Sequence, residues 1–272
     1  MKRLFLGAVA VIIALSFIGC KKDEGPKTDT PQLVAHGGGA VYGYRITNSR
    51  EAITNAYDNG FRYIELDFEL TTDGEIVIIH DWETMAERLL FDEGPVSLEE
   101  FNSAEKFMDF TLMDLNGLLS WLHEHDGCRI ITDTKNDNIK VLKKLAAGAP
   151  EDMTRFIPQI YGFEEYDAVI KLGFSDIILT PYEMGGEDIR ELLEFESENE
   201  LWAITMPQAH LTQGVVTALY RAGVRVYAHT VNDLAFYEMW KENGLFGIYT
   251  DYFYPNKWFE NIEAEKAEQE QK

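Results

Sequence analysis

The chain of 272 residues has few cysteines and few basic side chains. Lysine and arginine number 24 against 47 acidic residues, which gives a net charge of -23. A surface with this charge repels phosphate backbones, so the sequence argues against a general nucleic-acid-binding protein, and a phosphate-containing substrate requires a local cation. Apolar residues still make up 46% of the chain, enough for a large core, which excludes a mainly disordered protein.

An uncharged hydrophobic run spans only residues 4–18 and follows a basic N-terminus. It is too short for a comfortable membrane span and has the layout of a secretory signal. The run leads to Gly19-Cys20, which resembles a bacterial lipobox. We therefore expect residues 1–19 to be a lipoprotein signal peptide and Cys20 to carry a lipid anchor in the bacterial cell envelope, on its periplasmic or cell-surface face. An ordinary signal peptide cleaved elsewhere, or a transmembrane anchor, is the alternative.

With Cys20 lipidated, Cys128 is the one cysteine left in the chain. A single thiol forms no internal disulfide, so the core must stabilise the protein, and Cys128 is expected to be a buried small residue rather than a catalyst. Residues 20–32 contain two prolines and no apolar periodicity, as in a flexible tether. We expect the folded domain over residues 33–256 and a polar tail over residues 257–272.

Short runs of β-branched and aromatic residues alternate with helical patterns along the domain, which is typical of parallel strands joined by crossover helices. Eight strands are predicted, at residues 33–36, 63–70, 130–134, 155–161, 176–180, 202–206, 225–230 and 247–251. Helical patterns lie between them at residues 49–59, 112–123, 139–147, 164–172, 187–196, 212–222 and 234–242. This order predicts an α/β fold, a single (β/α)8 TIM barrel.

The second predicted strand is followed by an insertion. An extra strand is expected at residues 76–80, and residues 81–108 are too many for a simple barrel loop.

At the start of the helix predicted at residues 49–59, Asn48 and Glu51 have the spacing of a capping box, so we expect Asn48 to cap that helix.

Acidic side chains gather at the carboxyl ends of two predicted strands. Strand periodicity puts Glu65 and Asp67 on one face, and Asp133 with Lys135 repeats the same spacing on the third strand. Carboxylates that face a barrel mouth repel one another unless a cation lies between them. Because oxygen ligands suit a hard divalent metal, we expect a divalent cation at Glu65 and Asp67, with Asp133 as a candidate third carboxylate. A solvated edge strand is the alternative for an isolated Glu-x-Asp pair.

Two histidines end strands beside these carboxylates. His36 ends the first strand, and His80 ends the extra strand. A lone histidine is more often structural, but two of them beside a metal site suit an acid and a base. One imidazole would take a proton from an attacking hydroxyl, and the other would give one to the leaving oxygen, while the metal and Lys135 stabilise the phosphoryl charge.

These residues resemble the motifs of the glycerophosphodiester phosphodiesterase family, in its superfamily with phosphatidylinositol-specific phospholipase C. The resemblance extends over about residues 33–255, and the ordered block from His36 to Asp81 is specific. The matching residues are His36 with Gly38, Asn48-Ser49, Glu51-Ala52-Ile53, Gly60, Ile64-Glu65-Leu66-Asp67, Thr72-Asp73-Gly74, Val77 to Asp81, Asp133-Thr134-Lys135 and Thr230-Val231-Asn232.

The resemblance implies a barrel, one bound metal and phosphodiester cleavage. It also implies that His36 and His80 are the acid-base pair and that the carboxylates bind calcium or magnesium. In this family a substrate hydroxyl next to the phosphate attacks first, and water then opens the cyclic phosphate. The sequence leaves open which histidine is the base.

The chain departs from the family pattern at three places. Gly37 stands where the family has an arginine that binds phosphate, so Arg45 or Lys135 is expected to supply that charge. Residues 46–49 replace the family's Pro-Glu-Asn-Thr and lack its carboxylate, and Asp133 replaces a longer glutamate. His229 is a further candidate for substrate binding, with an ordinary strand residue as the alternative.

The sequence thus predicts a lipid-anchored, metal-dependent hydrolase that cleaves small glycerophosphodiesters to sn-glycerol 3-phosphate and an alcohol. The alternatives are a phospholipase C- or D-like lyase that acts on lipid headgroups and leaves a cyclic phosphate, and a non-catalytic barrel that binds phosphoesters. The missing arginine favours the last. The alcohol group, the metal, the membrane leaflet and the oligomeric state are not determined by the sequence.

Overall fold

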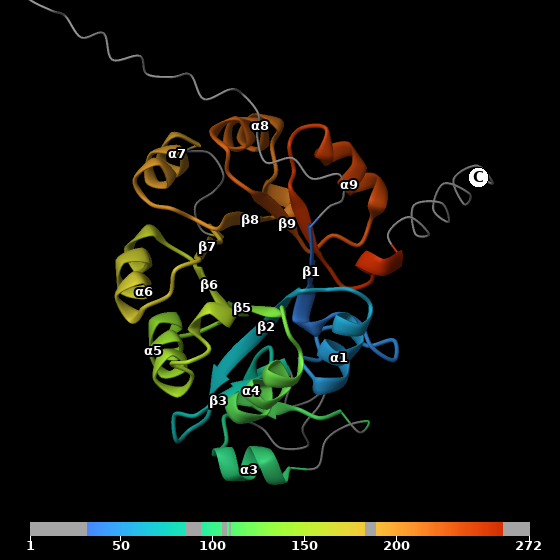
Figure 1. The fold of residues 1–272 in the computed structure, drawn as a ribbon, viewed down its shortest axis with the longest axis vertical. Coiled ribbons are helices and arrows are strands. Elements are labelled where there is room, and N and C mark those ends of the chain that lie inside the picture. The colour runs from blue at the N-terminus through green and yellow to red at the C-terminus, as the bar shows by residue number, and fades with distance from the viewer. Residues whose placement is uncertain (1–31, 85–93, 105–107, 109, 183–188, 258–272) are drawn as a thin grey trace, which may run out of the picture.

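The computed structural model is a closed ring of parallel strands surrounded by helices (Figure 1). It describes residues 32–84, 94–104, 108, 110–182 and 189–257. The signal peptide and most of the tether and tail that the sequence predicts therefore lie outside the described residues. Within the described ranges, no helix combines the length and the apolar character needed to cross a membrane.

Eight parallel strands form the barrel, and the pairing of β1 with β2 closes it. In spatial order these strands are β1 (Gln32–Ala35), β10 (Gly247–Thr250), β9 (Val226–His229), β8 (Ala203–Pro207), β7 (Ile178–Leu179), β6 (Phe156–Ile160), β5 (Arg129–Asp133) and β2 (Tyr63–Leu70). Each coincides with a predicted strand, so the predicted TIM barrel is confirmed.

Among the described residues, seven helices cover the barrel between its strands (Figure 1). They are α1 (Arg50–Asp58), α4 (Leu115–Glu124), α5 (Asn138–Gly148), α6 (Tyr166–Leu172), α7 (Ile189–Glu198), α8 (Gln213–Ala222) and α9 (Leu234–Lys241). Short 3₁₀ turns occur at His36–Gly38, Met153–Arg155, Phe163–Glu165, Gln208–His210 and Pro255–Lys257. The helix predicted from residue 112 begins later, because Met113–Asp114 forms a short strand first.

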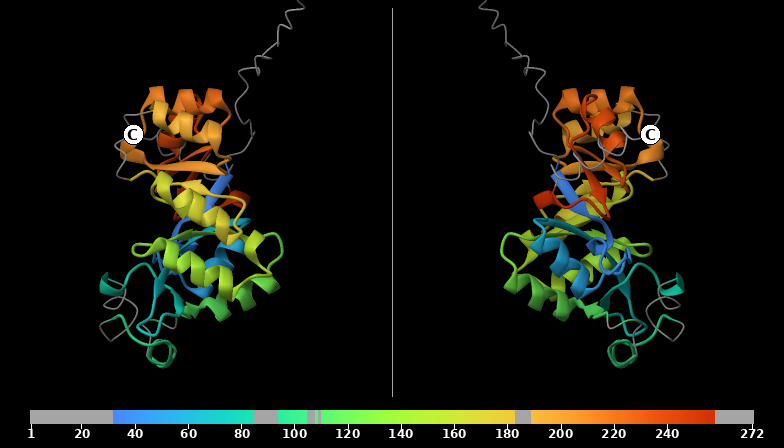
Figure 2. Two further views of the ribbon diagram at one scale, coloured as in Figure 1. Left: turned by 90° about the vertical axis from the view of Figure 1, so that its left-hand side faces the viewer. Right: turned by 90° about the vertical axis from the view of Figure 1, so that its right-hand side faces the viewer.

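The described part of the insertion after β2 contains two antiparallel strands, a helix and a helical turn at residues 82–84. The strand β3 (Ile76–Ile78) pairs with β2, and β4 (Met113–Asp114) pairs with β3. The helix α3 (Leu98–Ser103) lies between them in the chain and begins with a complete capping box at Ser97. In the side views the insertion projects at the end of the molecule away from α8 (Figure 2). The insertion predicted after the second strand is confirmed, and the extra strand ends two residues earlier than expected.

The predicted cap of the first helix is wrong. Ser49, and not Asn48, is the N-cap of α1, and its hydroxyl accepts a hydrogen bond from the amide of Ala52. Asn48 has a φ of 52° and directs its side chain to Asp67 instead. An asparagine tolerates this left-handed conformation, which frees its amide group for a tertiary contact.

Side chains along β2 point alternately into the hydrophobic core and toward the candidate site. Ile64, Leu66 and Phe68 are fully buried and belong to the main hydrophobic core. Glu65, Asp67 and Glu69 are also buried, and they lie on the opposite face of the strand. Because this face points into the barrel, the strand carries a row of three carboxylates toward the interior.

The barrel interior below this row is filled with side chains. Ile131, Ile157, Ile178, Tyr227 and Tyr249 form one buried cluster contributed by five different strands. A filled interior of this kind is a packed core rather than a pore, so polar side chains meet solvent at the carboxyl ends of the strands. The position of the candidate site follows from this packing.

Cys128 is fully buried, and burial raises the pKa of its thiol to about 12, in agreement with the expected structural role.

Candidate active site

Three acidic side chains form a buried cluster at the carboxyl ends of β2 and β5. Glu65, Asp67 and Asp133 each offer an oxygen, and these oxygens lie within 4.8 Å of one another. The three residues are only 2%, 3% and 6% exposed. Burial, and then the charge of Asp67, raise the pKa of Glu65 to about 8. Three oxygen ligands that repel one another in a buried place fit a hard divalent cation, as the sequence predicts.

Each carboxylate of this cluster is held by a neighbouring group. The backbone N–H of Gly37 donates to Glu65 Oε2 at 2.7 Å. Asn48 Nδ2 donates to Asp67 Oδ2 at 2.9 Å, and Asn48 Oδ1 accepts from the Asp67 amide at 3.0 Å. The hydroxyl of Tyr161 donates to Asp133. These bonds fix the direction of the ligand oxygens, as outer contacts do in metal sites.

Lys135 contributes the positive charge closest to the cluster. Its Nζ lies 2.5 Å from Asp133 Oδ2 and 3.1 Å from Asp67 Oδ1. Burial alone would lower the pKa of this ammonium, but the charges of Asp67 and Asp133 hold it well above its ordinary value. Lys135 therefore stays charged at the edge of the cluster, where a phosphoryl group would meet it.

His36 is oriented by a carboxylate from the far end of the chain. Its Nδ1 lies 2.9 Å from Asp251 Oδ1, and Asp251 also accepts from Asn232 Nδ2 at 2.7 Å. A proton shared with Asp251 on Nδ1 leaves Nε2 as the nitrogen free to exchange a proton with substrate. Burial lowers the pKa of His36, but the bond to Asp251 and the charge of Glu65 outweigh it and raise the pKa to about 9.

His80 has the same arrangement with its neighbour in sequence. Its Nδ1 lies 2.5 Å from Asp81 Oδ2. Asp81 in turn accepts from the amide and the hydroxyl of Thr84, both at 2.6 Å. Burial raises the pKa of Asp81, but the two bonds from Thr84 outweigh it and lower the pKa to about 2. The carboxylate that orients His80 is thus ionised at neutral pH.

Each histidine follows a strand that pairs with β2. In the β1–β2 ladder Ala35 pairs with Ile64, and His36 is the first residue after β1. In the β2–β3 ladder Phe68 pairs with Ile78, and His80 is the second residue after β3. Both histidines therefore come from segments next to the strand that carries Glu65 and Asp67.

Two other predicted substrate-binding residues have different positions. Arg45 is half-exposed, and its Nη1 lies 3.5 Å from Asp251 Oδ2 rather than at the carboxylate cluster. His229, at the end of β9, is bonded through Nδ1 to the hydroxyl of Thr205 at 2.9 Å. Its Nε2 is buried and has no hydrogen-bond partner within the described residues. Burial, and then the charge of His36, lower the pKa of His229 to about 4, so its imidazole is neutral.

The sequence analysis missed three residues of the site. Asp251 and Tyr161 bind the predicted residues His36 and Asp133, and Glu69 continues the row of Glu65 and Asp67. A signal existed for two of them, since Asp251 ends a predicted strand and Glu69 is two residues beyond Asp67 on the same strand face. Burial, and then the charge of Asp81, raise the pKa of Glu69 to about 7.

Comparison with known proteins points to one family. Residues 37–152 match the model of the glycerophosphoryl diester phosphodiesterase family. No curated protein matches the chain in sequence.

Solved structures share the fold. A glycerophosphodiester phosphodiesterase from Thermotoga maritima is similar to this chain with a TM-score of 0.68 and 18% identity, over 87% of this chain and 100% of that one. An Oleispira antarctica phosphodiesterase in complex with the product sn-glycerol-3-phosphate has a TM-score of 0.69 and 18% identity, over 86% and 97%. A glycerophosphoryl diester phosphodiesterase from Parabacteroides distasonis has a TM-score of 0.68 and 17% identity, over 89% and 90%.

Gly37→Ala is expected to lower the free energy of unfolding by about 1–3 kcal/mol, measured by urea denaturation. Gly37 has a φ of 53°, and an added Cβ would lie 2.6 Å from the Cα of Ile46. Gly43→Ala is the matched control, because Gly43 has a φ of 83° and no atom within 4 Å of the added Cβ. An equal loss in both variants would contradict the role of the Ile46 contact. The same contact leaves no room for an arginine side chain at position 37.

Calcium or magnesium is expected to stabilise the protein more at pH 8 than at pH 5. The raised pKa of Glu65, about 8 against an ordinary 4.5, means that the folded metal-free protein holds a proton that the unfolded chain releases. The free energy of unfolding of the metal-free protein therefore falls as the pH rises through this window, and a bound cation reverses the loss.

With the cation at about a hundredfold excess over its Kd at pH 8, the gain of roughly 2.7 kcal/mol corresponds to a rise in Tm of about 5–10 °C. Differential scanning calorimetry measures it. Glu65→Gln is expected to abolish the rise, while Glu191→Gln, at an exposed position of α7, keeps it. A rise of the same size in both variants would place the cation elsewhere.

Proposed function

We propose that this chain, whose residues 37–152 match the model of the glycerophosphoryl diester phosphodiesterase family, is a member of that family and hydrolyses glycerophosphodiesters to sn-glycerol 3-phosphate and an alcohol with the help of one divalent cation. Membership of this family makes the chain a phosphoric diester hydrolase. The observation that carries the finer proposal is the buried cluster of Glu65, Asp67 and Asp133, together with a carboxylate-bound histidine after each of two strands that pair with β2. The product seen in the Oleispira antarctica phosphodiesterase supports the same substrate class.

The three carboxylates would hold the cation. When bound there, it supplies positive charge that polarises the phosphoryl oxygens and favours the ionised form of a substrate hydroxyl. Lys135 adds a second positive charge on the same side, since its Nζ contacts both Asp67 and Asp133. Calcium and magnesium both suit this oxygen-only ligand set.

The two histidines would move the protons. In the first step a glycerol hydroxyl next to the phosphate attacks phosphorus, and the bond from phosphorus to the alcohol oxygen breaks. One imidazole takes the proton of the attacking hydroxyl, and the other gives a proton to the departing alcohol. In the second step water opens the cyclic phosphate, with the two proton transfers reversed. Asp251 and Asp81 keep the free nitrogen of each ring available.

His229 would bind a phosphoryl oxygen as a neutral donor. Its Nδ1 is bonded to the Thr205 hydroxyl, and when that hydroxyl donates the bond, Nε2 carries the ring proton. Nε2 is buried without a partner in the described part of the chain. An unsatisfied buried donor of this kind is costly unless a ligand accepts its hydrogen bond. Arg45, half-exposed beside Asp251, would meet the phosphate from the solvent side.

His36→Ala and His80→Ala are each expected to lower kcat by about 10²–10⁴-fold, because each removes one proton transfer. The assay measures release of glycerol 3-phosphate from glycerophosphocholine after loading of the protein with calcium or magnesium, and circular dichroism verifies folding. His123→Ala is the matched control, since His123 is an exposed histidine of α4. Full activity of the double variant at His36 and His80 would refute the mechanism.

The same assay separates the alternatives. A lyase acting on lipid headgroups would cleave phosphatidylinositol in preference to glycerophosphocholine and release a cyclic phosphate. A non-catalytic barrel, which Gly37 in place of the family's arginine favours, would bind glycerol 3-phosphate but release no alcohol from any substrate, with or without a chelator.

We also propose that a lipid on Cys20 anchors the enzyme in the cell envelope, which rests on the sequence of residues 1–20 alone. In cells, the wild-type protein is expected in the membrane fraction, and Cys20→Ala is expected to leave it, because the lipid provides the membrane affinity. Fractionation followed by immunoblotting measures the distribution. Cys128→Ala is the control and keeps the membrane location. An unchanged distribution of Cys20→Ala would exclude the anchor.

A further inference from the structure

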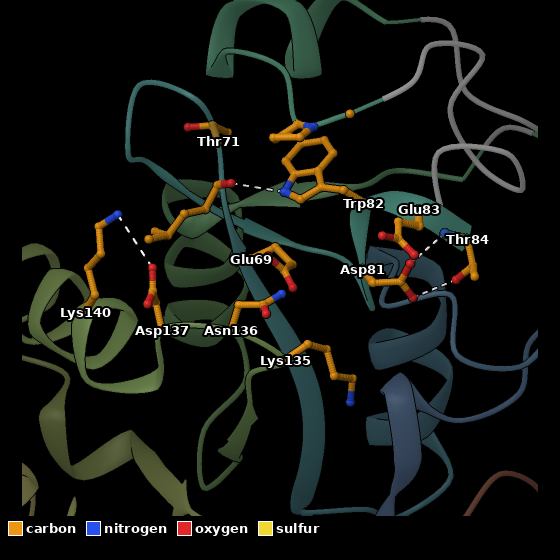
Figure 3. A pocket seen from close by; sticks show the side chains of 13 residues that line it. Glu69, Thr71, Asp81, Trp82, Glu83, Thr84, Lys135, Asn136, Asp137 and Lys140 are labelled. Atoms are coloured by element: carbon orange, nitrogen blue, oxygen red, sulfur yellow. Dashed lines mark hydrogen bonds and ion pairs between the residues drawn. The ribbon is translucent and has the colours of Figure 1, made fainter.

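A cavity of about 690 Å³ adjoins the carboxylate cluster on the side of His80. Its walls come from the end of β2, the residues that follow β3, the start of α5 and the turn at Gly94 and Pro95 (Figure 3). Lys135 and Asp81 line it, and these are the residues that contact the metal ligands and orient His80. A volume of this size is ordinary for a small-molecule site. The cavity thus lies next to the place where the phosphodiester would react, because Lys135 links it to the carboxylate cluster and Asp81 links it to His80.

Glu69 is the lining side chain whose carboxylate has a buried oxygen without a hydrogen-bond partner. It is 7% exposed, and its Oε1 is buried with no hydrogen-bond partner among the described residues. Figure 3 shows it in the middle of the lining residues, with Trp82 above it, Asp81 on one side and Asn136 on the other. A buried carboxylate oxygen without a partner is unfavourable unless a positive or hydrogen-bonding group of a ligand approaches it.

The wall carries more negative than positive charge. Glu69, Asp81, Glu83 and Asp137 line it, against Lys135 and Lys140. Both cations already face acids, because Lys135 contacts Asp67 and Asp133, and Lys140 lies 4.0 Å from Asp137. The charges of Glu69 and Glu83 are left without a basic partner in the described part of the cavity, which therefore attracts a cation.

An aromatic side chain completes the wall. The indole of Trp82 is 8% exposed, and its Nε1 donates to the carbonyl of Leu70 at 3.0 Å. This bond fixes the ring against β2. An aromatic ring beside carboxylates suits an organic ammonium group, since the ring quadrupole attracts a cation without demanding coordination geometry.

We propose that this cavity binds the alcohol group of the substrate and selects a small ammonium alcohol, with Glu69 as the residue that determines this specificity. The proposal rests on the function proposed above. The cavity adjoins His80 through Asp81, which lines it and is bonded to His80 Nδ1, so a group that leaves on the side of His80 would enter it. A second metal ion suits the cavity less. Among the described residues, the one group of three side chains that lie close enough together to hold a metal is Glu65, Asp67 and Asp133.

The first experiment measures a specificity ratio. The kcat/KM for glycerophosphocholine, with a cationic alcohol, is divided by that for glycerophosphoglycerol, with a neutral one. The wild-type ratio is expected to exceed one, and Glu69→Gln is expected to lower it by about tenfold or more, because one charge-assisted contact is lost.

Glu83→Gln, at an exposed position of the same wall, is expected to lower the ratio by about threefold, and it tests the proposal if Glu69→Gln folds poorly. Glu99→Gln is the control for net charge, since Glu99 is exposed on α3 outside the cavity, and it leaves the ratio unchanged.

The second experiment needs no catalysis. Isothermal titration calorimetry of the metal-loaded protein with choline chloride is expected to show binding that is at least about tenfold weaker in Glu69→Gln and unchanged in Glu99→Gln. A wild-type ratio of one or less, or equal choline affinity in Glu69→Gln and Glu99→Gln, would overturn the proposal. If the protein hydrolyses neither diester, the proposed function fails, and choline binding alone then decides whether the cavity holds an ammonium group.

Discussion

The repulsion among Glu65, Asp67 and Asp133 is the constraint on which the site depends. Three carboxylates with ligand oxygens within 4.8 Å of one another cannot all be ionised in a buried place without positive charge or hydrogen-bond donors around them. The protein supplies donors from elements that are distant in sequence, namely the Gly37 amide, the Asn48 amide group and the Tyr161 hydroxyl. With these donors in place, the remaining carboxylate oxygens are available to a cation. The need to stabilise the three negative charges therefore accounts for contacts made both by the loop after β1 and by residues near the end of β5.

The same constraint explains how the chain departs from the family that it resembles. Gly37 gives its N–H to Glu65 and lies so close to Ile46 that a side chain at this position would collide with the backbone. The positive charge for a phosphoryl group therefore has to come from other residues. Lys135 stands at the carboxylates already, and Arg45 is directed to Asp251, which also orients His36. The charged groups of this site thus contact both the carboxylate cluster and the carboxylate that orients His36.

Much of the fold was predictable because its signals are local. Eight apolar runs mark the strands, and their alternation with helical patterns leaves a parallel barrel as the arrangement that buries both faces of each strand. Period-two alternation also placed Glu65 and Asp67 on one face. The errors arose where a tertiary contact outweighed a local preference. Asn48 has a good residue type for a helix cap, but two hydrogen bonds to Asp67 hold its side chain in the barrel.

The sequence by itself determined which residues end the strands and that Glu65, Asp67 and Asp133 face one end of the barrel, since both follow from spacing along single segments. It could not identify the partner of His36, because Asp251 is 215 residues away and meets it only when β10 pairs with β1. The same closure surrounds His229, and the insertion turns the row of carboxylates on β2 into a cavity wall beside Trp82. These features were decided by the tertiary structure, because burial and pairing between distant segments exist only after the barrel has closed.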